Sequence, residues 1–203
     1  MVLGTGGWWA VAGDAARADS GRAVAICCAW GNRLADGVLT FSVTGDDPTA
    51  LSIIRQAVQA WDDTLPELSF SEVTTRPDKA DIVITYGPGT ADGGEAPSST
   101  GARGLTTTYM NTRRLVHKVE IGIDGGPAPV SAGAIEEIAK HELGHALGSG
   151  HANWDGDLMS PLVNPTPAPI PACDINAVRV ANSWKMSDHA RRAKPAPATS
   201  TPC

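Results

Sequence analysis

The chain has no long apolar run, and its basic residues are not clustered. No stretch of about 18 apolar residues occurs, so we expect no membrane-spanning helix. Among 203 residues, 22 are acidic and 16 are Lys or Arg, which gives a formal net charge of −6. Nucleic-acid-binding proteins need clustered Lys and Arg to neutralise phosphates. We therefore expect neither a membrane nor a nucleic acid as partner, and one domain of ordinary size with tails.

The N-terminus also lacks the pattern of a secretory signal peptide. Residues 2–11 are rich in Gly and Trp, have no basic lead and contain little leucine. Cysteine is scarce as well. The four cysteines are compatible with disulfides but do not require them, and the sequence leaves their pairing open: Cys27, Cys28, Cys173 and Cys203.

Histidine is rare too, yet three of the five histidines lie in residues 141–151, HELGHALGSGH. His141 and His145 are four residues apart, so on a helix they share a face, about 6 Å apart along the axis. Gly148 permits the left-handed turn that would end the helix and bring His151 back as a third ligand. Zinc prefers a tetrahedron of ligands, so a fourth position stays open for water, as in catalytic sites and unlike closed structural sites.

The spacing HExxHxxGxxH resembles that of the metzincin zinc endopeptidases. The resemblance continues at residues 157–161, DLMSP, where metzincins have a tight turn whose methionine lies beneath the metal, and Met159 matches that methionine. An isolated HExxH can arise by chance in a helix, but the added glycine, histidine and methionine argue against chance. Residues 80–87, ADIVITYG, are similar to a matrixin segment, so the matrixins are the most similar metzincins.

This resemblance implies a zinc-dependent endopeptidase that hydrolyses extended polypeptide substrates. His141, His145 and His151 would hold the zinc, and Glu142 would take a proton from the attacking water and pass it to the leaving amine. The resemblance also implies a secreted or extracellular protein, and we expect a monomer. A non-catalytic zinc-containing peptide-binding domain is one alternative, although the intact Glu142 argues against it. A metzincin of another subfamily is the second.

Three features depart from the matrixin pattern. Ala152 follows the third histidine, where matrixins usually have a small hydroxyl residue, so the subfamily is less certain than the clan. Residues 87–103 contain no histidine for the structural zinc of matrixins, and His117 alone cannot form that site. The matrixin latency motif is absent around Cys27 and Cys28, so a disulfide or burial is favoured over a thiolate that blocks the metal.

Calcium is a second metal that the sequence leaves open. Its hard oxygen donors would be Asp92, Glu95 and Asp124, which are equally well interpreted as solvated turn residues.

Periodicity and capping signals predict an α+β fold. The resemblance implies a mixed, mostly parallel five-stranded sheet with a long first helix, an active-site helix, a methionine turn and a C-terminal helix. We expect strands at 39–43, 68–73, 81–86, 104–110 and 115–123. We expect helices at 48–65, at 134–147 with Ser131 as N-cap, and at 175–184 with Asp174 as cap. The sequence does not tell whether 104–110 or 115–123 is the edge strand that could pair with a substrate.

The expected organisation is one catalytic domain between two tails. Residues 1–29 are interpreted as a flexible leader or short pro-segment, and residues 30–186 as the catalytic domain. Residues 187–203 are rich in Pro, Ala and Thr and are expected to be disordered.

Overall fold

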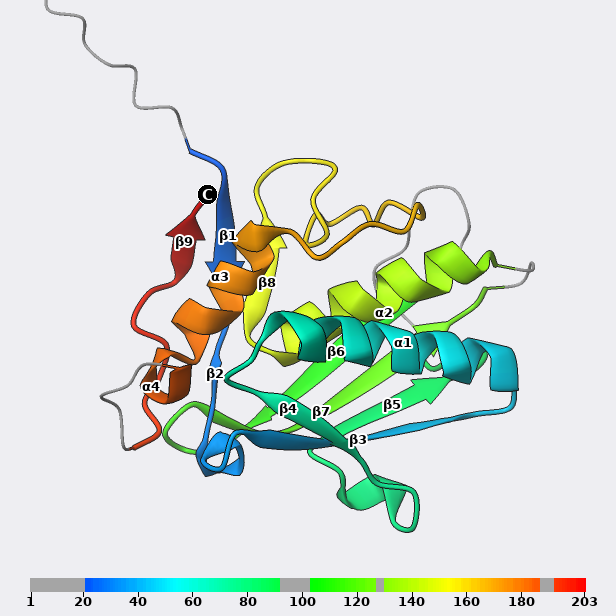
Figure 1. Ribbon diagram of the computed structural model, residues 1–203, viewed down its shortest axis with the longest axis horizontal. Helices are drawn as coiled ribbons and strands as arrows, with labels where there is room; N and C mark the ends of the chain where they lie inside the picture. The colour runs from blue at the N-terminus through cyan, green and yellow to red at the C-terminus, as the bar shows by residue number, and fades with distance from the viewer. Residues whose placement is uncertain (1–20, 92–102, 127–129, 187–191) are drawn as a thin grey trace, which may run out of the picture.

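The computed structural model describes residues 21–91, 103–126, 130–186 and 192–203. Within these ranges the chain forms two β-sheets and four α-helices, as Figure 1 shows. The predicted α+β class is confirmed.

The larger sheet is six-stranded and mostly parallel. In spatial order it contains β2 (Ala29–Trp30), β7 (Leu115–Asp124), β5 (Ile82–Tyr86), β3 (Val38–Gly45) and β4 (Ser69–Glu72), and β6 (Arg103–Met110) also pairs with β7. Every pairing is parallel except that of β6 with β7. Strands β3 to β7 are the five that the sequence predicts. The sheet has six strands and not the predicted five, because the sequence does not predict β2. Its two residues are too few to show periodicity.

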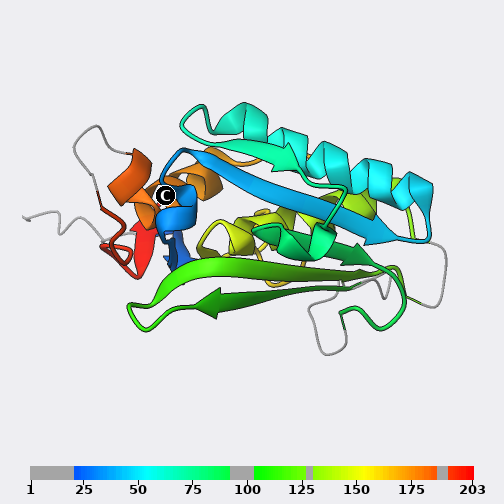
Figure 2. The ribbon, with the colours of Figure 1, turned by 90° about the horizontal axis from the view of Figure 1, so that it is seen from below.

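Strand β6 is an edge of this sheet. It pairs with β7 on one side, and no strand of the described ranges pairs with its other side. Of the two segments that the sequence leaves open, residues 104–110 therefore form the edge. Figure 2 shows β6 at the outer border of the sheet, with the long helices behind it.

Helices α1 (Pro48–Thr64) and α2 (Ala132–Ala146) pack against each other and cover one face of the sheet. The carboxylate of Asp47 caps α1 by accepting hydrogen bonds from two backbone N–H groups, at 2.8 and 3.2 Å. The indole of Trp61, a buried residue, donates to the carbonyl of Lys140 at 2.9 Å. This bond fixes α1 against the helix that carries His141.

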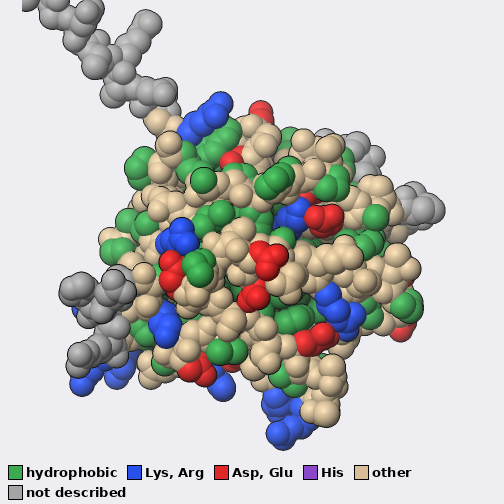
Figure 3. Space-filling model, in the orientation of Figure 1, with side chains coloured by type: hydrophobic (Ala, Val, Ile, Leu, Met, Phe, Trp, Pro, Cys, Tyr) green, Lys and Arg blue, Asp and Glu red, His purple; other side chains and the backbone are tan. Residues whose placement is uncertain are grey.

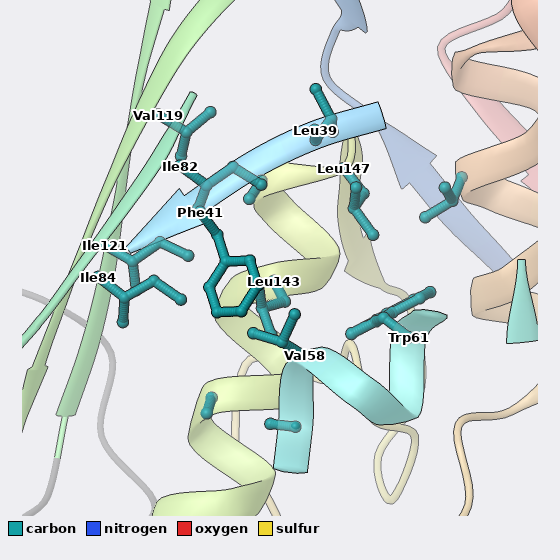
Figure 4. Packing of buried hydrophobic residues seen from close by; sticks show 14 of the residues in the cluster. Leu39, Phe41, Val58, Trp61, Ile82, Ile84, Val119, Ile121, Leu143 and Leu147 are labelled. Atoms are coloured by element: carbon teal, nitrogen blue, oxygen red, sulfur yellow. The ribbon is translucent and has the colours of Figure 1, made fainter. Parts of the chain in front are cut away.

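The hydrophobic core lies between the helices and the sheet. In Figure 4, Phe41, Ile84 and Ile121 of adjacent strands point toward Val58 of α1 and Leu143 of α2. Burial of one such side chain contributes about 1.5–3 kcal/mol. Leu143 lies between two of the metal-site histidines in the sequence, so its burial fixes the rotation of α2 about its axis.

A second sheet joins the two ends of the described chain. Its three antiparallel strands are β8 (Ser149–Ala152), β1 (Ala23–Ile26) and β9 (Ser200–Pro202), with β1 in the middle (Figure 1). A disulfide joins Cys203 to Cys173 beside it.

The expectation of a flexible leader and a disordered tail is therefore wrong for residues 23–26 and 200–202. These strands are short and pair with distant segments, so they leave no local sequence signal. Residues 1–20 and 187–191 lie outside the described residues.

The C-terminal helix differs from its prediction. Two helices, α3 (Ala172–Ala181) and α4 (Ser183–Met186), replace one, and the N-cap position of α3 is Pro171. Asp174 is not a cap: it lies inside the first turn and is fully buried. None of the helices in the described ranges has the length and apolar character needed to cross a membrane.

Candidate metal centre

Helix α2 carries two of the three clustered histidines. Ser131 caps it as predicted, accepting a hydrogen bond from the N–H of Ala134 at 3.2 Å. The helix ends at Ala146 with Leu147 as its C-cap, and Gly148 follows with φ of +102°, a left-handed conformation that glycine adopts readily. A side chain there would also meet the carbonyl of Cys28. The chain then turns directly into β8, which carries His151.

The structure brings all three predicted metal ligands together. One ring nitrogen from each of His141, His145 and His151 can be chosen so that these atoms lie within 4.8 Å of one another. The ring centroids are 4.6, 4.8 and 5.6 Å apart. Within the described ranges this is the one group of three or more His, Cys, Asp or Glu side chains with such a geometry.

Backbone carbonyls orient two of these rings. Nδ1 of His141 lies 2.6 Å from the carbonyl oxygen of Leu158, and Nδ1 of His145 lies 2.9 Å from that of Ser149. A carbonyl can only accept, so each Nδ1 carries the proton and each Nε2 presents a lone pair. Such carbonyl contacts are the usual outer support of metal-binding histidines.

The donor set fits a divalent cation. The two Nε2 atoms of His141 and His145 are 3.0 Å apart. Two nitrogen lone pairs at that separation need a shared positive centre, either a proton, which would make the contact a hydrogen bond, or a metal ion. Tetrahedral zinc with nitrogen ligands at about 2.05 Å would place them about 3.3 Å apart. The chemistry of three imidazoles therefore suits zinc at this position.

Glu142 lies beside the histidines, buried between α2 and the edge strand. The hydroxyl of Thr106 on β6 lies 2.7 Å from its Oε2 and 3.0 Å from its carbonyl oxygen. A Cβ on Gly104 of β6 would overlap the Glu142 carboxylate. The edge strand can approach the acid so closely because position 104 has no side chain. Sequence reasoning missed Thr106 and Gly104, since strand residues become neighbours of Glu142 only through tertiary packing.

Met159, the predicted floor of the site, packs against α2 at Gly144, between the two helical histidines in the sequence. It is fully buried, and a Cβ on Gly144 of α2 would overlap its sulfur. The N–H of Met159 donates to the carboxylate of Asp157 at 3.1 Å, and its carbonyl accepts from Ala152 N–H of β8 at 2.7 Å. The first of these hydrogen bonds lies within the methionine turn, and the second joins the turn to β8, the strand that carries His151.

A buried ionic network ties α2 to the proline-rich segment after the methionine turn. Nζ of Lys140 lies 2.7 Å from Glu136, 2.7 Å from Glu137 and 2.8 Å from the carbonyl of Ala168. The N–H of Ala168 also donates to Glu137 at 3.0 Å. The two carboxylates raise the pKa of Lys140 although burial opposes them, so the ammonium stays charged. The network fixes this segment beside the helix of the metal site.

Asp174 of α3 lies next to Asp157 of the methionine turn. Burial, together with the hydrogen bond and the charge of Asp157, raises the pKa of Asp174 to about 8. Neither Asp174 oxygen accepts a hydrogen bond from a donor. The protonated acid can instead donate to the neighbouring carboxylate, which supports the turn from below.

A cleft of about 370 Å³ opens beside the metal-site histidines. Its walls include Glu142, His145 and His151 on one side and the β6 residues Gly104 to Thr106 and Thr108 on the other. Cys27 also borders the cleft, in a disulfide with Cys28. An extended chain could therefore lie in this cleft along the edge strand, beside the acid.

The other proposed ligands do not join this centre. Asp92 and Glu95 lie outside the described residues. The carboxylate of Asp124 accepts hydrogen bonds from the N–H groups of Gly89 and Gly126, at 3.0 and 2.7 Å, which matches the interpretation as a turn residue. His117 borders a different cavity.

A comparison with protein families agrees with this geometry. The matrixin family profile matches residues 30–181. Curated proteins give no match. Two solved structures of myroilysin are similar, at 20% identity with a TM-score of 0.38 and at 14% identity with a TM-score of 0.44.

The first of these matches covers 56% of this chain and 42% of that chain, and the second covers 70% and 81%. This chain thus spans less than half of the first myroilysin chain. The family match, in contrast, runs through the large sheet, the three histidines, Glu142 and Met159. The chain belongs to the matrixin family of metallopeptidases.

Proposed function

We propose that the protein is a zinc-dependent endopeptidase that hydrolyses extended polypeptides, with Glu142 as general base. The observation that carries this proposal is the convergence of three imidazoles beside a buried glutamate at an open cleft. His141, His145 and His151 would hold the ion. Zinc bound there would polarise a water molecule and lower its pKa toward about 7.

Glu142 supplies the proton transfers in this scheme. Its carboxylate accepts a proton from the attacking water and returns it to the leaving amine. The Thr106 hydroxyl holds the carboxylate toward the cleft, since it donates to Oε2 at 2.7 Å. The tyrosine that follows the methionine turn in some metzincins is missing from this sequence, because its only tyrosines are Tyr86 and Tyr109.

The edge strand accounts for the extended substrate. Along β6, unpaired backbone N–H and C=O groups face the cleft in the described structure. A polypeptide can pair with them as an additional strand, which holds its scissile bond beside Glu142. Backbone pairing does not depend on the substrate's side chains, so any preference for particular substrate residues must come from pockets along the cleft.

The decisive experiment combines casein cleavage with metal analysis. The purified protein should cleave casein, a zinc chelator should abolish cleavage, and added zinc should restore it. Glu142→Ala should retain zinc and lose activity by a factor on the order of 10²–10⁴. Glu72→Ala, which removes a surface glutamate, should leave activity unchanged.

A Glu142→Ala variant that cuts casein at the parent rate would refute the role of the acid. A parent protein that binds zinc and peptides without cutting any would instead favour the non-catalytic binding domain. The extracellular location and the monomeric state remain predictions, which culture-supernatant analysis and sedimentation would test.

A further inference from the structure

A second cavity, of about 530 Å³, lies at the turn of the β6–β7 hairpin. We call it the arginine cavity, because Arg33, Arg113 and Arg192 line it together with His117, Asn32 and Asn111. No Asp or Glu is among its lining residues within the described chain. These side chains come from three separate parts of the chain, so the cavity exists only in the folded protein.

This concentration of positive charge is unusual for the molecule. The chain carries a net charge of −6. Elsewhere in the described structure basic side chains pair with acidic ones, as in Arg55–Glu72 at 2.8 Å and Arg179–Glu67 at 3.2 Å. Figure 3 shows several places on one face where basic and acidic side chains lie side by side. In the arginine cavity, Arg33 has only a long contact with Asp81, at 3.7 Å, and Arg113 and Arg192 have no ion pair with a described residue.

The hairpin turn that presents Arg113 is well fixed. The side-chain oxygen of Asn111 accepts hydrogen bonds from the N–H groups of Arg113 and Leu115, at 2.8 and 3.2 Å. Arg114 adopts φ of +59°, a left-handed conformation that costs a non-glycine residue about 1 kcal/mol or more. The turn therefore holds Arg113 on a defined backbone at the rim of the cavity.

The same hairpin borders the metal cleft. Residues Gly104 to Thr106 and Thr108 of β6 line the cleft, and the turn after β6 lines the arginine cavity. From Thr106, beside Glu142, to Asn111 is five residues, or about 17 Å at roughly 3.3 Å per residue. A chain extended along β6 would thus reach the cavity about five or six residues from the scissile bond.

We propose that the arginine cavity binds an acidic segment of the polypeptide substrate, at that distance from the cleaved bond. This inference rests on the proposed protease function. Guanidinium groups bind carboxylates through paired, charge-assisted hydrogen bonds. An acidic substrate is repelled by the net negative charge of the molecule, and the cavity supplies the local attraction that binding to this end of β6 requires.

Direct binding tests the cavity without relying on catalysis. The probe is a fluorescently labelled peptide in which a run of glutamates adjoins a neutral segment, and a second peptide has glutamines in place of the glutamates. Fluorescence anisotropy should show the glutamate peptide binding Glu142→Ala protein more tightly than the glutamine peptide. The double variant Arg113→Gln with Arg192→Gln should bind the glutamate peptide about tenfold more weakly and lose most of the salt dependence.

The matched control is Arg55→Gln with Lys79→Gln, which removes the same charge elsewhere and should bind like the parent. Equal binding of both peptides, or an equal loss in the control, would overturn the proposal. Binding of a sulfated oligosaccharide in place of the glutamate peptide would also overturn it, because the cavity would then serve a polysaccharide.

Cleavage measurements separate this inference from the proposed function. With the active protein, kcat/KM for a cleavable peptide with a glutamate run should exceed that for its glutamine counterpart, and the double arginine variant should cancel the difference. If no peptide is cut but the glutamate peptide still binds, the protease proposal fails while the cavity stands as an acidic-peptide site. If both peptides are cut equally, the cavity proposal fails and the protease proposal stands.

Discussion

Around Glu142, the close approach of the edge strand β6 to α2 limits which residues can stand on that strand. Gly104 has no side chain because the carboxylate occupies that space, and Thr106 places its hydroxyl 2.7 Å from the acid. Both positions lie on β6, opposite the motif that the sequence reveals. The acid is therefore held by the partner strand as much as by its own helix.

Replacing Thr106 with valine should slow catalysis without removing the metal. Valine keeps the shape and strand preference but deletes the hydrogen bond that orients the Glu142 carboxylate. We expect kcat to fall about 5- to 20-fold, on the order of 1–2 kcal/mol, with KM and zinc content unchanged. Thr107→Val, on the opposite face of the strand, is the control. An unchanged kcat in Thr106→Val would show that the helix alone positions the acid.

Gly144→Ala should destabilise the protein even though alanine favours helices. Removing a glycine from a helix gains up to about 1 kcal/mol in propensity. The new methyl would overlap the Met159 sulfur in a buried site, and such overpacking costs about 1–3 kcal/mol. Thermal unfolding should therefore show a net loss, together with weaker zinc binding. A more stable variant would mean that the methionine floor can move freely.

At the scale of elements, the position of α2 depends on its contacts with three other parts of the structure. The Trp61 indole fixes it to α1, the core fixes its rotation, and the Lys140 network fixes it to the proline-rich segment. Each contact lies within a turn or two of His141. The geometry of the metal site is thus set by packing that extends well outside the motif.

Lys140→Met should be strongly destabilising. The change removes the cation and leaves Glu137 buried without its partner. Breaking one side of a buried ion pair costs about 3–5 kcal/mol. Chemical denaturation should show that loss, whereas Lys118→Met, which breaks the more exposed pair with Glu120, should cost under about 1 kcal/mol. Equal small effects in both variants would show that Glu137 is effectively solvated.

The sequence predicts those elements whose signals are local. The cap Ser131, the periodic helices, the five main strands and the histidine spacing are all contained within short windows. Strands β1, β2 and β9 are two to four residues long and form by pairing with segments that are distant in the sequence. The sequence predicts Asp174 as a helix cap because acidic residues are common at that position. In the structure Pro171 occupies the N-cap position, and Asp174 lies in the first turn of α3.

At the scale of the whole molecule, stability should depend on pH through Asp174. Its pKa is raised to about 8 from an ordinary value of 3.8, so the folded state holds a proton that the unfolded state releases. The stabilisation is complete below the unfolded pKa and is lost as pH rises through about 8. Between roughly pH 4 and 8 the free energy of unfolding should fall, by at most about 1.4 kcal/mol per unit.

Urea unfolding across this range would measure the slope, and Asp174→Asn should flatten it. A slope that persists in Asp174→Asn would assign the effect to another group.

The Cys173–Cys203 disulfide should contribute more to stability than the Cys27–Cys28 disulfide. The first bridges 30 residues and the second bridges neighbours. The loop-entropy relation gives about 3–4 kcal/mol for a loop of that length and almost nothing for adjacent residues. Cys203→Ser should therefore lower the melting temperature by about 10 °C, and the Cys27→Ser, Cys28→Ser double variant should change it little. The reverse order would contradict this account.

The second sheet also has a consequence for when the protein can become active during synthesis. His151 lies on β8, β8 pairs with β1, and β1 pairs with β9 near the C-terminal end of the described chain. On a ribosome the first two histidines would be made well before β9, and the strand with the third would still lack part of its support. A nascent chain would therefore carry an incompletely braced metal site, which would limit its ability to cut its neighbours until β9 has been made and has paired with β1.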